Sequence, residues 1–154
     1  MGIISKVTKN IEGKAHYFKF PVWYDYTVGV AGEIFAKNLK EKGVLTGAKC
    51  PSCGKVFLPP RVYCEECFEE IKDFVALEPV GVVETYCEVY EDIEGNKFDK
   101  PKVVAFVRIA GSCGGLFGFI EGSVQIGDKV KGELAEKRKR TGTVSDILCY
   151  KKVG

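Results

Sequence analysis

Residues 50–67 read CPSCGKVFLPPRVYCEEC, and this stretch decides the fold of the chain. It contains two Cys-x-x-Cys pairs separated by ten residues. The two sulfurs of each pair can share one tight turn, and the segment between the pairs is long enough to fold back as a hairpin. Four thiolates that meet at one point form a tetrahedral metal site with no position left open for a substrate. The pattern therefore predicts a structural metal site made by Cys50, Cys53, Cys64 and Cys67.

Zinc is the metal that this ligand set favours, because zinc accepts four sulfurs in a tetrahedron and requires no redox chemistry. Gly54 follows the first pair and can take the positive φ that a turn beneath a metal often needs. The second pair lacks that glycine. Iron of the rubredoxin kind also binds four thiolates, and ordinary thiols or two disulfides are the remaining alternatives.

Length and composition allow one ordinary domain together with a small metal-stapled module, since the chain has 154 residues of which 45% are hydrophobic. Lys plus Arg total 23 against 21 Asp plus Glu, and the net charge of +2 gives no global signal for nucleic acid or membrane binding. The N-terminal sequence MGIISKVTKN lacks the apolar core of a secretory signal, and no apolar run reaches the length of a membrane span. The seven cysteines fit a reducing compartment. We therefore expect a cytoplasmic protein.

Residues 1–26 are expected to form an aromatic arm. Seven ring-bearing side chains fall within eleven positions there: His16, Tyr17, Phe18, Phe20, Trp23, Tyr24 and Tyr26. Because Pro21 and the irregular spacing disfavour a helix, we predict an extended arm. Its rings pack either on the chain's own core or on a partner protein, since aromatic clusters are typical of binding hot spots.

An amphipathic helix is predicted over residues 27–42, with Thr27 as its cap and Gly43 at its end. Its apolar stripe consists of Val28, Ala31, Phe35 and Leu39. The zinc ribbon follows over residues 44–76. The run after Cys67, residues 68–79, is interpreted as a short linker with three apolar residues that dock the ribbon on the next domain: Phe68, Ile71 and Phe74.

From Pro79 onward the apolar residues recur with a period of two. Strands are predicted over residues 80–92, 102–111, 116–122, 130–137 and 143–153, with a polar loop over residues 93–101. Gly81 is interpreted as a bulge in the first strand. The inward face of the second strand is expected to carry Val103, Ala105, Val107 and Ile109. Five short strands without a sizeable helix predict a small closed barrel of the OB type.

The sequence offers no catalytic constellation, because its single histidine, His16, lies in the aromatic arm. Cys113 stands in a glycine-rich turn as a candidate exposed thiol, although a small apolar residue at a strand end is the favoured interpretation. Cys87 and Cys149 lie within strand patterns and are expected in the core. Two features are candidates for binding anions or stacking on bases. They are the basic run over residues 137–140 and a face that combines Phe106 and Arg108 with Phe117 or Phe119. In the alternative interpretation the basic run is a solvated hairpin, and the rings fill the barrel or meet the aromatic arm.

In their order along the chain, these features resemble an acyl-CoA-associated family that joins a rubredoxin-like zinc ribbon to an OB-fold domain. The resemblance covers residues 27–150. It rests on the helix before the ribbon and on the strand start at residues 81–85. It also rests on four motifs: Cys50-x-x-Cys53-Gly54, Pro59-Pro60-Arg61, Cys64-x-x-Cys67 and Ile126-Gly127-Asp128-Lys129-Val130. The Pro-Pro-Arg segment between the cysteine pairs is its most specific part. The chain departs from the family in its longer aromatic arm and in Phe74, where a tryptophan is common.

The resemblance implies a mainly β protein with an aromatic arm and helix over residues 1–43, a zinc ribbon over 44–76 and a five-stranded OB-fold barrel over 77–154. It implies a non-catalytic subunit that docks on a thiolase-like catalytic subunit and helps to shape or hold its CoA or acyl-CoA site. The settings that fit are thiolytic cleavage of an aromatic succinyl-CoA intermediate and hydroxymethylglutaryl-CoA formation. The candidate contacts to CoA phosphates are Arg61, Arg108 and Arg138.

Two alternatives to an accessory subunit remain open. A nucleic-acid-binding module is one, because zinc ribbons and OB barrels both occur there, although the near-neutral net charge counts against it. A free-standing thiol enzyme that uses Cys113 is the other.

Overall fold

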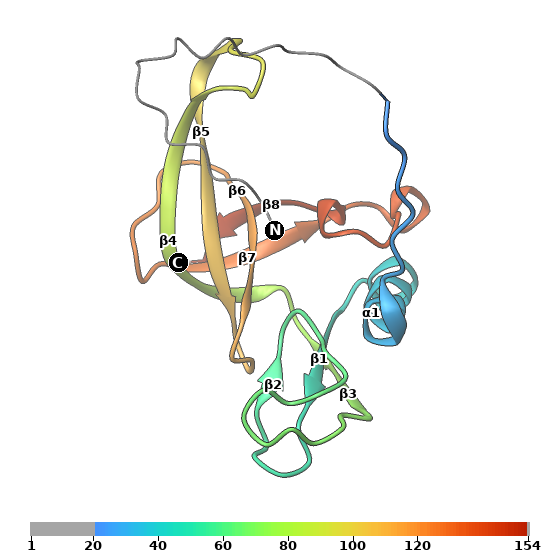
Figure 1. Ribbon diagram of the computed structural model, residues 1–154. Helices are drawn as coiled ribbons and strands as arrows, with labels where there is room; N and C mark the ends of the chain where they lie inside the picture. Colours follow the sequence, from blue (N-terminus) through green and yellow to red (C-terminus); the bar gives the residue numbers. More distant parts are fainter. Residues whose placement is uncertain (1–20, 154) are drawn as a thin grey trace, which may run out of the picture.

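The computed structural model describes residues 21–153, which form a mainly β fold with a single α-helix among them. The helix α1 (Gly29–Lys42) leads into a small sheet of β1 (Leu45–Lys49), β2 (Val56–Phe57) and β3 (Asp73–Leu77). A barrel follows, made of β4 (Val80–Glu91), β5 (Lys97–Ile109), β6 (Gly115–Ile120), β7 (Lys129–Leu134) and β8 (Ile147–Lys152). Figure 1 shows the small sheet at one end of the barrel and α1 beside the sheet. The predicted succession of helix, ribbon and five-stranded barrel is confirmed.

The helix begins two residues later than predicted and ends, as predicted, at Gly43 in the left-handed conformation. Gly29, the first residue of α1, has a φ of 65°, so that the helix cannot extend back through it, and glycine adopts this conformation without steric cost. Val28 occupies the cap position and is exposed rather than part of a buried stripe, while the Thr27 hydroxyl accepts a hydrogen bond from the Gly29 N–H at 3.2 Å. The buried members of the predicted stripe are Ala31 and Leu39. Residues 1–20 of the predicted aromatic arm lie outside the described residues.

The small sheet has the order β2-β1-β3, so that β1 is its central strand. The interpretation of residues 68–79 as a linker is wrong in part, because Asp73–Leu77 forms β3 and pairs along all of β1. β2 has only two residues and covers part of one edge of β1, whereas β3 pairs with the whole opposite edge and satisfies its backbone groups. Ile71 and Phe74 pack in the core of the ribbon itself, whereas Phe68 is exposed.

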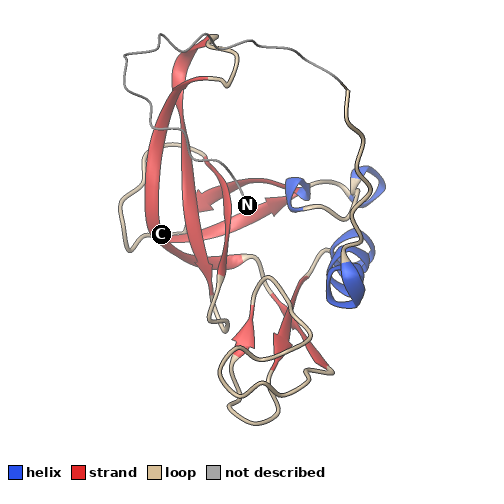
Figure 2. Cartoon of the chain, in the orientation of Figure 1, coloured by secondary structure: helices blue, strands red, loops and turns tan. Residues whose placement is uncertain are grey.

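The barrel has the strand order β4-β5-β6-β8-β7 and closes by pairing β7 with β4. β6 and β8 run parallel, and the other neighbouring strands are antiparallel. This is the topology of an OB-fold barrel, and Figure 2 shows its strands in red, with β7 and β8 running across β4 and β5. The predicted inward face of β5 is confirmed, although β5 starts at Lys97 and the preceding loop is shorter than predicted.

Gly81 does not form the predicted bulge. The register of β4 against β5 shifts at Glu84 and at Tyr90 instead. A Cβ at Gly81 would lie 2.2 Å from the Arg108 carbonyl oxygen, so glycine is needed there because the two strands approach closely.

The turn between β5 and β6 joins the barrel to the ribbon. The backbone N–H of Cys113 donates a hydrogen bond to the Val56 carbonyl in β2 at 2.8 Å. At the next residue, Gly114, a Cβ would lie only 1.8 Å from the Leu58 carbonyl oxygen. Leu58 also belongs to the hydrophobic cluster that fills the barrel, as does Leu39 of α1. Helix, ribbon and barrel therefore share one core.

The loop between β7 and β8 is organised by the buried Asp146. Its carboxylate accepts hydrogen bonds from the N–H groups of Thr141 and Gly142, at 2.9 and 2.7 Å, and from the Thr141 hydroxyl at 3.1 Å. Burial pushes the pKa of this carboxyl up, but these donors together with Arg140 outweigh burial and hold the pKa below its ordinary value. The loop packs on α1, because a Cβ at Gly142 would lie 2.8 Å from the Ala36 carbonyl oxygen.

We expect Asp146→Asn to lower the Tm at pH 7 by about 5 °C, because an amide cannot accept all the hydrogen bonds that the carboxylate accepts. A carboxyl whose pKa is lowered by folding stabilises the protein above its unfolded pKa of about 3.9 and loses this effect as the pH falls through the folded pKa. The Tm difference should therefore shrink below about pH 4. Thermal unfolding at pH 7 and pH 3 measures the Tm difference between the variant and the unaltered protein, and a variant of an exposed aspartate, Asp99→Asn, is the control. An undiminished difference at pH 3 contradicts this account.

No helix among residues 21–153 has the length and apolar character needed to cross a membrane.

Candidate metal centre

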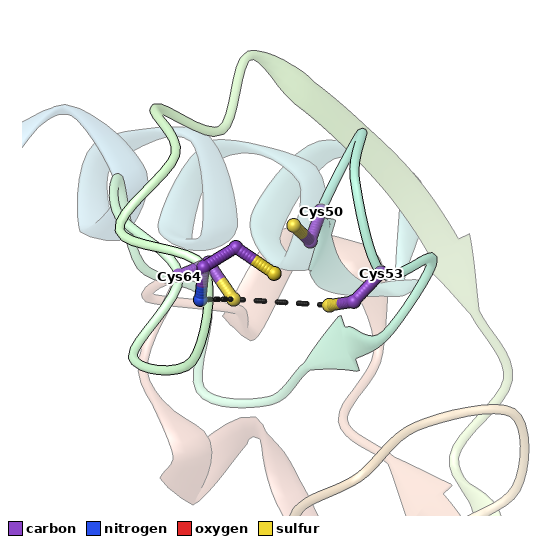
Figure 3. Close-up of side chains that lie close together, drawn as sticks. Cys50, Cys53 and Cys64 are labelled. Atoms are coloured by element: carbon purple, nitrogen blue, oxygen red, sulfur yellow. Dashed lines mark hydrogen bonds between the residues drawn. The ribbon is translucent and has the colours of Figure 1, made fainter.

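The four predicted cysteines come together in the ribbon. Their Sγ atoms all lie within 4.8 Å of one another, and the sulfurs of Cys53 and Cys64 face each other 3.8 Å apart (Figure 3). Zinc–sulfur bonds of about 2.3 Å in a tetrahedron place the sulfurs about 3.8 Å from each other. The ribbon therefore positions four cysteines to bind one metal ion, and the donor set fits zinc.

The first pair of ligands lies in a tight turn between β1 and β2. The Gly54 N–H donates to the Cys50 carbonyl at 3.0 Å, and the Cys50 N–H donates to the Lys55 carbonyl at 2.8 Å. Gly54 has a φ of 73°, which is the left-handed conformation expected of this glycine. These bonds fix the turn that presents both sulfurs to the centre of the site.

The second pair repeats this geometry without glycine. The Phe68 N–H donates to the Cys64 carbonyl at 3.0 Å, and the Cys64 N–H donates to the Glu69 carbonyl at 2.9 Å. Phe68, at the position equivalent to Gly54, has a φ of 58°. Sequence reasoning noticed the missing glycine but not that Phe68 takes its conformation. Superposing the two Cys-x-x-Cys pairs with their following residues reveals the equivalence.

The ligands also form much of the ribbon's interior. The buried hydrophobic cluster of the ribbon consists of Ala48, Cys50, Phe57, Cys64 and Ile71. Two of its five members are metal ligands, so this core is too small to hold the ribbon together without the metal. With all four positions taken by protein sulfurs, the site is structural and offers no open coordination position to a substrate.

The thiols differ in acidity before a metal binds. The backbone N–H of Cys53 is the largest influence on Cys50 and lowers the pKa of that thiol to about 7. The neighbouring Cys53 sulfur is the largest influence on Cys67 and raises the pKa of that thiol to about 12. A metal must displace protons from the cluster, so the apparent metal affinity falls as the pH decreases.

A second cluster combines Cys149 with the carboxylates of Glu121 and Glu133, whose ligand atoms also lie within 4.8 Å of one another. Lys151 already pairs with both carboxylates, since its Nζ lies 3.2 Å from Glu121 and 2.6 Å from Glu133. The cluster is therefore an exposed ion-pair network on the strand ends, with Cys149 half-buried beside it.

The expectation that Cys87 lies in the core is wrong. The register shift at Glu84 turns the following part of β4, so that Cys87 pairs with Val104 on the outer face and is exposed. Cys113, the candidate exposed thiol, is exposed and not a buried apolar residue, and its backbone joins the ribbon to the barrel.

Arg61 lies beside a groove between the helix and the ribbon. The groove has a volume of about 450 Å³ and is lined by residues 28–32, Phe35 and residues 59–62. The Arg61 guanidinium stands 4.7 Å from the centre of the Phe57 ring and pairs with Glu65 at 2.5 Å. Its contact with a phosphate stays a prediction.

The other two candidate arginines lie on other parts of the fold. Arg108, on the outer face of β5, pairs with Glu84 of β4. Arg138, in the 3₁₀ turn Lys137–Lys139, lies 3.1 Å from Glu136. The three arginines therefore belong to the ribbon, the barrel sheet and the β7–β8 loop, and each is ion-paired with a nearby glutamate.

The predicted aromatic face lies on the outside of β5 and β6. Phe106 pairs in register with Phe117, and the centres of their rings are 5.1 Å apart in an edge-on arrangement. Phe119 is half-exposed on the same face, with the Lys102 Nζ 5.9 Å from its ring centre. The face therefore carries accessible rings beside a cation.

Comparisons with known proteins agree with this architecture. Residues 38–73 match the family described as ChsH2, rubredoxin-like zinc ribbon domain. A DUF35 domain-containing scaffold protein of Methanothermobacter thermautotrophicus is 29% identical over 122 residues, which are 74% of this chain and 87% of that protein. One from Methanocaldococcus jannaschii is 33% identical over 78 residues, which are 47% of this chain and 52% of that protein.

Two solved structures extend the likeness to three dimensions. A structure titled Ltp2-ChsH2(DUF35) aldolase has a TM-score of 0.60 at 19% identity, covers 83% of this chain and 98% of its own, and shows likeness of fold alone. A DUF35 family protein from Sulfolobus solfataricus has a TM-score of 0.64 at 33% identity and covers 80% of this chain and 84% of its own. A four-cysteine ribbon joined to an OB barrel, with this degree of identity over both parts, makes the chain a member of the DUF35 family.

Proposed function

We propose that this chain is a non-catalytic, zinc-binding accessory subunit of a thiolase-type enzyme complex that acts on CoA thioesters. It docks on the catalytic subunit and helps to shape or hold the CoA or acyl-CoA site. Thiolytic cleavage of an aromatic succinyl-CoA intermediate and hydroxymethylglutaryl-CoA formation are the reactions we consider.

The closed metal site is the observation that carries this proposal. Four protein sulfurs leave the metal no position for a substrate, so the ribbon serves as a rigid element and not as a reaction centre. The single histidine of the chain lies at position 16, so residues 21–153 contain no histidine-based catalytic set. Two further observations support an accessory role. Two relatives are described as scaffold proteins, and the chain shares its fold with a chain of the Ltp2-ChsH2(DUF35) aldolase.

Within such a complex, Arg61, Arg108 and Arg138 are the proposed contacts to CoA phosphates. Arg61 has the best-defined surroundings, because it borders the groove between α1 and the ribbon. A guanidinium binds phosphate oxygens through paired N–H donors, so it can exchange Glu65 for a phosphate. The residues of this chain then bind and orient the thioester, and the catalytic subunit makes and breaks its bonds.

Affinity purification of the tagged chain from its own cells, followed by mass spectrometry of bound proteins, tests the proposal. We expect a larger thiolase-like enzyme in stoichiometric amount. Arg61→Ala should weaken CoA-thioester binding by the isolated complex roughly tenfold, whereas Lys72→Ala, an exposed ribbon lysine paired with Glu70, should not. Recovery of the chain without any enzyme contradicts the proposal, and unchanged binding by the Arg61, Arg108 and Arg138 variants contradicts its ligand part.

A second candidate function is the binding of single-stranded nucleic acid. The observation that favours it is the face of Phe106, Phe117 and Phe119 beside Lys102, since OB barrels stack bases on exposed rings beside cations. A gel shift with single-stranded RNA or DNA that weakens as salt is raised supports this function. The absence of a shift at low salt removes it.

A further inference from the structure

Phe68 adopts a backbone conformation that is costly for any residue other than glycine. At a φ of 58°, the Cβ of an L-residue crowds its own backbone, and the first metal turn uses Gly54 at the equivalent position. The Phe68 side chain is 81% exposed, so packing within the described residues does not offset this cost. A large aromatic ring kept exposed at a strained position indicates a role outside the fold of this chain.

The ring also projects from a rigid support. Cys64 and Cys67 hold the turn on the metal, and the Phe68 N–H is bound to the Cys64 carbonyl at 3.0 Å. On the same hairpin, Tyr63 forms a β-bridge with Glu70 and is also exposed. The backbone that carries the ring is therefore held in place, and only the two side-chain torsions of Phe68 have to be ordered when it binds, which is the property of an interface anchor.

The surroundings of the ring are acidic. Residues 65–70 read EECFEE, so that four glutamates flank Phe68 in the sequence and no basic residue lies among them. Glu65, Glu66 and Glu70 pair with basic residues of the ribbon yet remain at least half exposed. Glu69 has no ion-pair partner within the part of the chain that the structure describes. Glu69 is therefore the negative charge beside the ring that a partner can pair with, and a surface that covers this turn needs an apolar pocket with a positive charge opposite Glu69.

We propose that Phe68 is an anchor by which this chain binds the catalytic subunit, with its ring in an apolar pocket rimmed by Lys or Arg side chains. The identity of the partner rests on the proposed function. Three properties select the second metal turn as the docking surface: the strain at Phe68, its exposure and Glu69 beside it, which is unpaired among the described residues. All three are observed in this chain and do not depend on the proposed function.

Phe68→Gly separates this role from a structural one, because the two predict opposite results. Glycine relieves the strained φ and removes few contacts, so the Tm should rise by roughly 2 °C. Binding of the variant to the purified catalytic subunit should weaken roughly 30-fold. Glu69→Lys should weaken binding roughly tenfold, with a larger effect at low salt. Ile93→Gly, which removes a fully exposed apolar side chain from the β4–β5 hairpin, is the matched control and should leave binding unchanged.

The measurement is biolayer interferometry between each variant and the catalytic subunit recovered with the unaltered chain, together with thermal unfolding of each variant. Unchanged affinity of Phe68→Gly overturns this inference alone. A loss of affinity accompanied by a lower Tm also overturns it, because the ring then serves the fold. Recovery of no enzyme with the unaltered chain overturns the proposed function and this inference together.

Discussion

Cys50→Ser is expected to unfold the ribbon and to lower the Tm of the zinc-loaded protein by on the order of 20 °C. Binding of a structural zinc contributes about 10 kcal/mol or more to the folding of small zinc-binding modules, because the site does not exist in the unfolded chain. Cys50 is fully buried, and its replacement leaves a hydroxyl among apolar neighbours and an incomplete tetrahedron. Chelation of the metal should have the same effect on the unaltered protein.

Thermal unfolding with zinc and with an excess of chelator measures this effect, and hydrogen exchange over residues 45–77 locates it. Cys113→Ser is the matched control, since Cys113 is exposed and only its backbone N–H takes part in the ribbon–barrel contact. Its Tm should change by less than about 2 °C. Equal Tm values for the Cys50 and Cys113 variants, or no response to chelation, contradict the assignment of the metal site.

Gly114→Ala should destabilise the protein by about 3 kcal/mol and lower its Tm by roughly 10 °C. The added Cβ would stand 1.8 Å from the Leu58 carbonyl oxygen, a distance that no side-chain rotation can relieve because both atoms belong to the backbone framework. The β5–β6 turn must then move away from β2. This movement also breaks the Cys113 N–H to Val56 hydrogen bond that joins barrel and ribbon.

Gly122→Ala separates this clash from the general cost of replacing a glycine. Gly122 has a φ of 87° but no atom near the position of an added Cβ, so its replacement costs only backbone strain of about 1–2 kcal/mol. Urea unfolding of both variants gives the two free energies. Equal costs contradict the view that the turn is packed directly on the ribbon.

The metal ligands and the barrel could be predicted from the sequence because both depend on short-range regularities. The double Cys-x-x-Cys spacing brings four sulfurs together whatever surrounds them. Alternation in β5 places Val103, Ala105, Val107 and Ile109 on the interior side because each successive side chain changes face.

The features that could not be predicted depend on contacts between distant segments. Cys87 faces outward because an extra residue at Glu84 shifts the register, and nothing in the local alternation marks that residue. β3 forms only because β1 offers it a free edge. The need for glycine at Gly114 arises from Leu58, more than fifty residues earlier in the chain.

The role of Arg61, Arg108 and Arg138 as contacts to CoA phosphates stays a prediction, and the sequence could not place the three side chains in space. They lie on three parts of the fold because ribbon, barrel and loop each contribute one. A shared role in binding one ligand therefore requires that ligand, or the partner subunit, to extend across the molecule. Single alanine variants of each arginine in the assembled complex distinguish such a role from three unrelated surface ion pairs.

Native mass spectrometry of the complex isolated from its own cells tests the central claim most directly, because one spectrum reports both the metal and the partner. The account predicts an assembly that contains this 17.0 kDa chain with one zinc ion per copy, bound to a larger enzyme that acts on CoA thioesters. Detection of the chain without zinc, without a bound enzyme, or bound only to nucleic acid would contradict this prediction.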